Sequence, residues 1–166
     1  MVEPFASRPH MPGYGIAAAN EGDGLLPWTW AEERLHESRN FWLATRSADG
    51  QPHLMPVWAV WHADGLWFSS SKGSRKARNL SGDPRCTLST EDAQNPVVVA
   101  GVAELLTDVA DLQTMLRAMN AKYATDYGLD MLDPALNGAY RLRPTWAFGL
   151  RADNFSGTPT RWTFAP

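Results

Sequence analysis

The chain has 166 residues and a net charge of −3, with 44% hydrophobic and 20% charged residues, a composition that predicts one domain with its own buried core. Residues 72–78 carry four positive charges, so the remainder of the chain sums to −7; this balance favours a small anionic ligand and argues against nucleic acid. The single cysteine, Cys86, excludes an internal disulfide and favours a reducing, cytoplasmic setting, and no uninterrupted apolar run predicts a signal peptide or membrane span.

Residues 1–26 mix proline, glycine and polar residues without periodicity, which predicts an extended N-terminal arm that packs on the domain. We expect residues 27–166 to form one domain, because no repeat or second boundary is visible. Thr29 and Glu32 have the spacing of a capping box, so we expect a helix from there to about Ser38.

A strand is predicted over 40–46, a turn over 47–51 and a second strand over 52–62. The second strand has apolar residues on both faces, which predicts two dry faces. Pro56 lies in its middle and removes a ladder donor, so this section is expected at a sheet edge or bulge. Such a section leaves backbone groups free to face a ligand.

After a third strand over 66–70, the chain concentrates its positive charge. With the segment from Gly73 helical, Lys72, Arg75, Lys76 and Asn79 stand at i, i+3, i+4 and i+7, on one face. Hydroxyl groups, backbone N–H groups and converging cations at a helix start are typical of a phosphate site. A solvated basic turn is the alternative that the segment alone leaves open.

The rest of the chain predicts strands over 85–90 and 97–106, a helix over 108–127 capped by Asp108, a loop over 128–138 and closing strands. The closing strands are expected over 139–142, 146–150 and 160–164. This order predicts a mainly β (α+β) fold, a small antiparallel barrel with helices packed outside.

The order of motifs resembles the split β-barrel family of flavin and deazaflavin oxidoreductases, relatives of pyridoxamine 5′-phosphate oxidase. The likeness rests on the Asp-Gly hairpin, the run Gln51 to Trp58, the Ser-Arg-Lys-Ala-x-Asn-Leu segment from Ser74 to Leu80, and Asp83-Pro84-Arg85. It extends from about Thr29 to Thr107, and more loosely to the C-terminal Arg161 to Phe164.

The resemblance implies a split antiparallel barrel that forms a homodimer, with two cofactors in grooves at the interface. It implies that the cofactor phosphate is held at the helix and that the flat ring lies along the second strand. The cofactor-binding residues implied are Met55, Pro56, Val57, Trp58, Ser70, Ser71, Lys72, Ser74, Arg75, Lys76 and Asn79. A looser likeness points to Trp146, Arg161 and Trp162 as residues supplied by a second subunit.

The resemblance also bears on which cofactor is bound. FMN-binding relatives usually carry an arginine on the second strand, whereas residues 55–59 contain no cation. This departure favours the deazaflavin F420 over FMN and argues against pyridoxamine 5′-phosphate oxidase activity.

No acid–base pair or metal site is predicted, and hydride transfer needs neither, because the protein mainly positions the cofactor ring against the substrate. His53 and His62 lie nine residues apart on opposite strand faces, so structural roles are favoured for both; Cys86 is expected in the core. Lys72-Gly73-Ser74 is not a nucleotide-hydrolase loop, because Trp67 stands where that motif needs glycine.

We therefore expect an F420-dependent reductase that passes a hydride to a small organic molecule. The alternatives are an FMN-dependent enzyme of the same fold, a non-catalytic carrier of a cofactor or haem, and a barrel that stacks single-stranded nucleic acid on its tryptophans, which the acidic balance disfavours. The sequence does not separate carrier from enzyme, since both would use the same binding residues.

Overall fold

The computed structural model describes residues 3–165, and antiparallel pairing joins all nine of their strands into one sheet. Strand order along the sheet is β1-β9-β8-β7-β6-β2-β3, while β5 pairs with both β8 and β4. The elements are β1 (Phe5–Ser7), α1 (Trp28–Glu37), β2 (Phe41–Arg46), β3 (Pro52–Val57), β4 (Ala59–His62), β5 (Gly65–Ser71), α2 (Arg75–Gly82), β6 (Arg85–Thr90), β7 (Val97–Leu106), α3 (Val109–Tyr123), η1 (Leu129–Leu132), β8 (Asn137–Gly149), η2 (Ala152–Asn154) and β9 (Thr160–Thr163).

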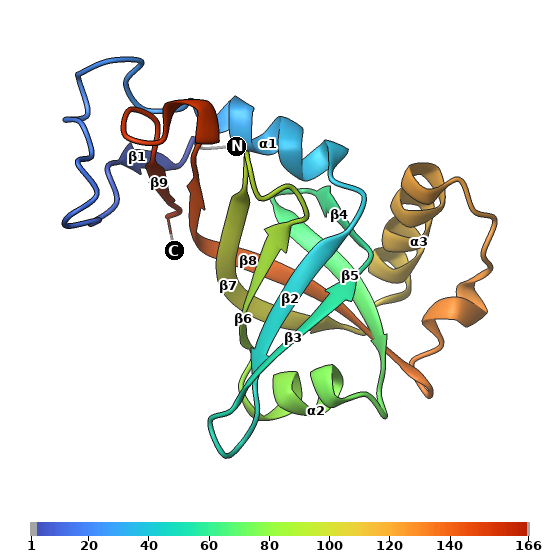
Figure 1. The fold of residues 1–166 in the computed structure, drawn as a ribbon. Helices are drawn as coiled ribbons and strands as arrows, with labels where there is room; N and C mark the ends of the chain where they lie inside the picture. Colours follow the sequence, from blue (N-terminus) through green and yellow to red (C-terminus); the bar gives the residue numbers. More distant parts are fainter. Residues whose placement is uncertain (1–2, 166) are drawn as a thin grey trace.

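The sheet curls into a barrel, with α1 across one end, α2 across the other and α3 beside β4 and β5 (Figure 1). This confirms the mainly β architecture with helices outside. The strands predicted over 85–90 and 97–106 coincide with β6 and β7, whose residues alternate between the core and the outer surface. Asp108 caps α3 as expected, accepting hydrogen bonds from the N–H groups of Ala110 and Asp111.

The single strand predicted over 52–62 is wrong, because the chain changes partner at Trp58. β3 pairs with β2 alone and forms a sheet edge, while β4 pairs with β5. The edge position of Pro56 is confirmed. The expectation of two dry faces fails for β3, where Leu54 is 57% exposed and Met55 42% exposed.

Three predicted boundaries also need correction. α1 begins one residue earlier than expected, with Pro27 at the N-cap and no side-chain cap from Thr29. α3 ends at Tyr123, four residues short of the prediction, because Ala124 adopts a left-handed conformation (φ 53°) that stops the helix. The two closing strands predicted around Pro144 are one continuous strand, β8, which takes up an extra residue, Thr145, as a bulge opposite Ala100 and Gly101 of β7.

A substitution at Gly101 tests the geometry of this bulge. A Cβ atom at this position would clash with the carbonyl oxygen of Arg143, a backbone atom that cannot rotate away. We expect Gly101→Ala to lower the free energy of unfolding by about 1–3 kcal/mol, the usual cost of overpacking. Chemical denaturation measures it, with Gly82→Ala as control because a Cβ there meets nothing within 4 Å; equal stability of the two variants would contradict the bulge geometry.

The N-terminal arm lies against the C-terminal strand. β1 pairs with β9, and the Arg8 guanidinium donates to the carbonyl oxygens of Gly157 and Pro159 at 2.8 Å. Trp162 on β9 is fully buried and contacts Trp28 edge-on, with ring centroids 5.5 Å apart. The expectation that Trp162 reaches a second subunit is therefore wrong: it belongs to this chain's own core. Among the described residues, no helix is both long and apolar enough to cross a membrane.

Candidate functional site

The turn between β5 and α2 brings several hydroxyl and cationic side chains to one corner of the barrel. Ser74 is the N-cap of α2, and its Oγ accepts a hydrogen bond from the Ala77 N–H at 3.1 Å. The Ser70 and Ser74 hydroxyl groups lie 2.9 Å apart, and the Lys72 N–H donates to the Leu136 carbonyl oxygen at 2.9 Å. The turn is thus held in place by the end of β5 and the segment before β8, with the helix start open to solvent.

The cations of this turn are not used for ion pairing. Within residues 3–165, none of Lys72, Arg75, Lys76 and Arg78 lies within 4.0 Å of a carboxylate, whereas five ion pairs form elsewhere. Lys72 and Arg75 are exposed and Lys76 is half-buried. Unpaired cations at a capped helix start, next to two serine hydroxyl groups, fit a phosphate ester as ligand.

Two members of the predicted set differ in their surroundings. Lys72 precedes the helix instead of belonging to it, so the shared helical face holds Arg75, Lys76 and Asn79. Asn79 is only 7% exposed, and its Nδ2 donates to Thr45 Oγ1 of β2 at 2.9 Å. Because α2 crosses the barrel end, the face runs from solvent at Arg75 to the interior at Asn79.

Arg78 lies apart from this face. Its guanidinium turns back along the helix and donates to the Gly73 carbonyl oxygen at 2.6 Å. Its charge is thus directed to the turn's own backbone.

The edge strand β3 runs from the α2 corner towards α3, and its last residues are the predicted ring segment. Met55 and Pro56 are exposed, whereas the Val57 side chain is 8% exposed and packs in the core. Trp58 follows the strand and stacks on Tyr123 of α3, with ring centroids 4.2 Å apart and an interplanar angle of 6°. One face of the Trp58 ring is therefore covered by this chain.

The last turn of α3 fixes the break between β3 and β4. Tyr123 Oη accepts from the Ala59 N–H at 2.9 Å and donates to the Arg39 carbonyl oxygen at 2.7 Å. Lys122 Nζ donates to the Ala59 carbonyl oxygen at 2.9 Å. These contacts are not predictable from local sequence patterns, because Lys122 and Tyr123 are 63 and 64 residues from Ala59 in the chain.

The buried ammonium group of Lys122 makes the free energy of unfolding depend on pH. Burial lowers the pKa of its ammonium group to about 8, and the charge of Glu91 opposes the shift. Above this pKa the folded chain has released a proton that the unfolded chain still holds, so the folded state gains stability as pH rises from about 8 towards the usual lysine pKa. We expect the free energy of unfolding of the wild-type chain, relative to that of Lys122→Met, to increase between pH 8 and about pH 10.5. Chemical denaturation of both chains at these two pH values measures the difference. Parallel pH profiles for the two chains would contradict the burial of Lys122.

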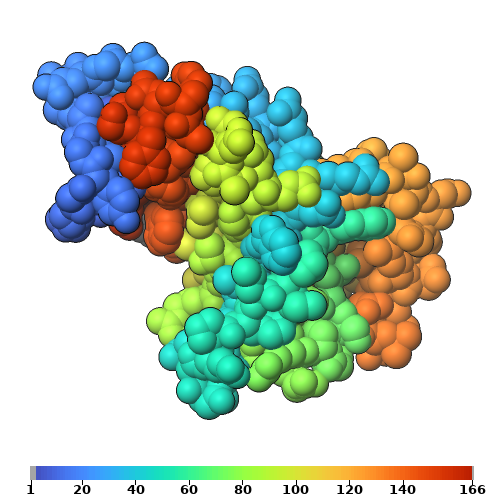
Figure 2. All heavy atoms as spheres, viewed as in Figure 1, coloured from blue at the N-terminus to red at the C-terminus, as the bar shows by residue number. Residues whose placement is uncertain are grey.

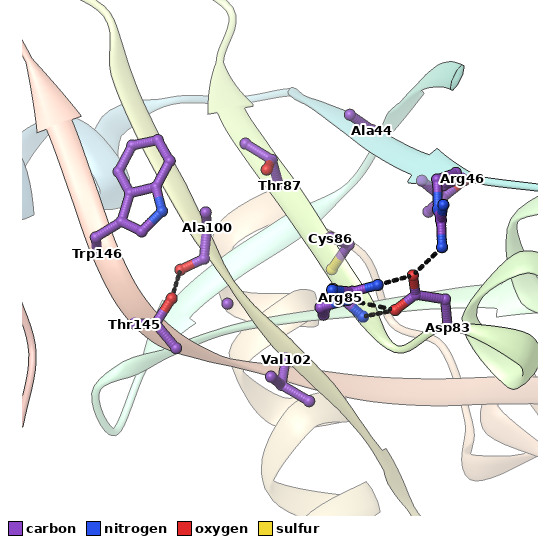
Figure 3. A pocket seen from close by; sticks show the side chains of 12 residues that line it. Ala44, Arg46, Asp83, Arg85, Cys86, Thr87, Ala100, Val102, Thr145 and Trp146 are labelled. Carbon is purple, nitrogen blue, oxygen red and sulfur yellow. Dashed lines mark hydrogen bonds and ion pairs between the residues drawn. The ribbon is translucent and has the colours of Figure 1, made fainter. Parts of the chain in front are cut away.

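A second groove lies elsewhere, on the outer face of the sheet, and contains none of the predicted cofactor-binding residues. It has a volume of about 650 Å³. Strand register places one row of side chains across its floor, and Figure 3 shows Ala44, Thr87, Ala100 and Trp146 from four successive strands. Figure 2 shows this side hollowed between the blue and red terminal segments and the teal hairpin.

Three charged side chains lie at one rim of this groove. Asp83 accepts from Arg85 at 2.7 Å and from Arg46 at 3.1 Å, and the Arg85 guanidinium holds the pKa of the Asp83 carboxyl well below its usual range. Cys86 lines the groove wall but is buried, and burial raises the pKa of its thiol to about 12, so it stays neutral and unreactive. The prediction of Cys86 as a core residue is confirmed.

An antiparallel barrel with an open strand edge and a cation-rich turn is the architecture of split β-barrel proteins. A family model matches residues 30–151, and the chain belongs to that family, described as pyridoxamine 5′-phosphate oxidase. No curated protein sequence matches the chain.

Solved structures share the fold. A conserved hypothetical protein of Mycobacterium tuberculosis, Rv2991, is 23% identical with a TM-score of 0.67, covering 86% of this chain and 88% of that one. A structure titled F420 reductase is 24% identical with a TM-score of 0.58, covering 70% and 94%. HutZ, the heme storage protein from Vibrio cholerae, is 22% identical with a TM-score of 0.58, covering 68% and 86%.

Proposed function

We propose that this protein is a homodimeric, F420-dependent reductase of small organic molecules. The observation that carries the proposal is the unpaired cation cluster at the start of α2, beside an edge strand that bears no cation. Ser74, Arg75 and Lys76, with Lys72 and Ser70 next to them, would hold the single negative charge of a phosphodiester. Ser71 would lie where the ring joins the tail.

The ring would lie along the backbone from Met55 to Trp58. Pro56 has no N–H and the strand has no neighbour on its open side, so the backbone of this segment is available to a flat ligand. When bound, reduced F420 supplies the hydride, and this chain's residues bind, orient and shield it. The absence of cations on β3 supports F420 over FMN, whose phosphate monoester carries more charge.

The second copy is expected on the outer face of the sheet. Trp42, Leu54 and Val102 are 44%, 57% and 42% exposed there, and the small side chains of Ala44, Thr87 and Ala100 leave a groove in this face that a second copy would fill. Contiguous exposed apolar surface of this kind is typical of protein interfaces. Because Leu54 belongs to β3, a second copy on this face would border the ring segment at Met55 and Pro56 and complete the cofactor groove.

Activity is tested by mixing the purified protein with chemically reduced F420 and a panel of quinones and activated enones. We expect protein-dependent return of the oxidised cofactor's visible absorption with at least one acceptor. A carrier would bind F420 and leave the rate of every acceptor unchanged, which would contradict the reductase proposal. Adding haem in place of F420 tests the alternative that the protein is a non-catalytic haem carrier.

A further inference from the structure

A hydrogen-bonded chain of three side chains runs from α2 through β2 to the edge strand β3. Asn79 Nδ2 donates to Thr45 Oγ1 at 2.9 Å, and Thr45 Oγ1 lies 3.5 Å from His53 Nδ1. Asn79 and Thr45 are 7% and 5% exposed, and His53 is half-buried. This series of hydrogen bonds thus connects the barrel interior with a side chain at the open edge of the barrel.

These hydrogen bonds fit the tautomer of His53 that carries its proton on Nε2. Thr45 Oγ1 accepts from Asn79 Nδ2 and keeps its own hydrogen, which it can donate to His53 Nδ1. An imidazole whose Nδ1 accepts a hydrogen bond carries its proton on Nε2. In that tautomer the Nε2–H group of His53 is available as a donor.

Strand register decides where this donor lies. Thr45 and His53 are direct partners in the β2–β3 pair, so Nδ1 faces β2 and Nε2 lies on the side of the ring away from Thr45. Arg75 in the first turn of α2 reaches Gln51 Oε1 at 3.4 Å, and Gln51 lies directly before β3, two residues ahead of His53. The first turn of α2 and the His53 ring thus share one corner of the barrel.

We propose that His53 is a member of the anion site, donating from Nε2 to a phosphate-ester oxygen that Arg75 and Lys76 also bind. Asn79 and Thr45 act as positioning residues that orient the imidazole. The inference rests on the proposed function and changes the role of Asn79, which serves the phosphate through two intermediaries instead of touching it.

The test uses inorganic phosphate as the probe and records the imidazole nitrogens of His53 by ¹H–¹⁵N NMR. We expect the free protein to show protonated Nε2 and unprotonated Nδ1, and phosphate to shift the Nε2 resonance together with the backbone resonances of Arg75 and Lys76. Thr45→Val should abolish the tautomer preference and weaken phosphate binding. His53→Leu should weaken it roughly tenfold or more, the effect of losing one charge-assisted bond, and His53→Gln, which keeps an N–H donor, should retain most of it. His62→Gln is the matched control, since His62 is exposed on β4.

Each outcome has a defined meaning. Shifts at Arg75 and Lys76 with an unchanged His53 ring would overturn the inference and leave the anion site standing. A response at all three residues, in a protein that binds neither F420 nor FMN, would keep the inference and overturn the proposed function. No response at any of them would overturn both.

Discussion

The double substitution Arg75→Ala with Lys76→Ala should raise the dissociation constant for F420 at least about a hundredfold. Each charge-assisted hydrogen bond to a phosphate oxygen contributes about 1.5–3 kcal/mol, and the double variant loses both cations of the first helical turn. Neither side chain forms an ion pair among residues 3–165, and Arg75 makes one long contact with Gln51. We therefore expect the thermal stability without ligand to change little, so that binding alone reports the loss.

The matched control is Arg78→Ala, which removes a cation from the same helix. Its guanidinium turns back to the helix start, where it is already bonded to the Gly73 carbonyl oxygen. We expect a much smaller loss of affinity in a fluorescence titration. An Arg78→Ala loss as large as that of the double variant would show that the phosphate lies on a different face of α2.

Placing a charge at the centre of the outer sheet face should convert the proposed dimer to a monomer. Ala100 lies between Thr87 and Trp146 in the row across the groove floor. An arginine there would be buried against a second copy without a partner, and an uncompensated buried charge costs about 3–5 kcal/mol. Ala100→Arg should therefore raise the dimer dissociation constant by about 10²–10³-fold, measured by analytical ultracentrifugation.

Gln113→Arg adds the same charge on the exposed side of α3 and should remain dimeric. Because the proposed groove is completed by the second copy, Ala100→Arg should also weaken F420 binding, while its far-ultraviolet circular dichroism stays that of the wild type. A variant that remains dimeric would place the interface on another surface. A monomeric variant with full F420 affinity would show that one chain forms the whole site.

Local patterns in the sequence predicted the elements whose partners are near in the chain. The Asp108 cap, the apolar face of α3 and the limits of β6 and β7 follow from spacing and turn residues. The family was recognised from the order of short motifs, each of which is local. The cation-rich turn after β5 was found in the same way, because its charges are adjacent in sequence.

Features that depend on distant pairing were not predictable in this way. The break at Trp58 follows from β3 and β4 having different partners and from the Tyr123 contacts of α3. The groove floor is assembled by register from four strands that span a hundred residues. The sequence favours a structural role for His53, because His62 lies nine residues away on the opposite strand face; only the folded barrel brings His53, Thr45 and Asn79 together.

The most direct test of the proposed F420-dependent function is a fluorescence titration of the purified, ligand-free protein with F420 and, in parallel, with FMN. We expect saturable, tight binding of F420 with one site per chain and much weaker binding of FMN, since the single-charge phosphodiester matches a site whose edge strand has no cation. Tight binding of FMN with weak binding of F420 would contradict the cofactor assignment, and binding of neither would contradict the proposed reductase itself.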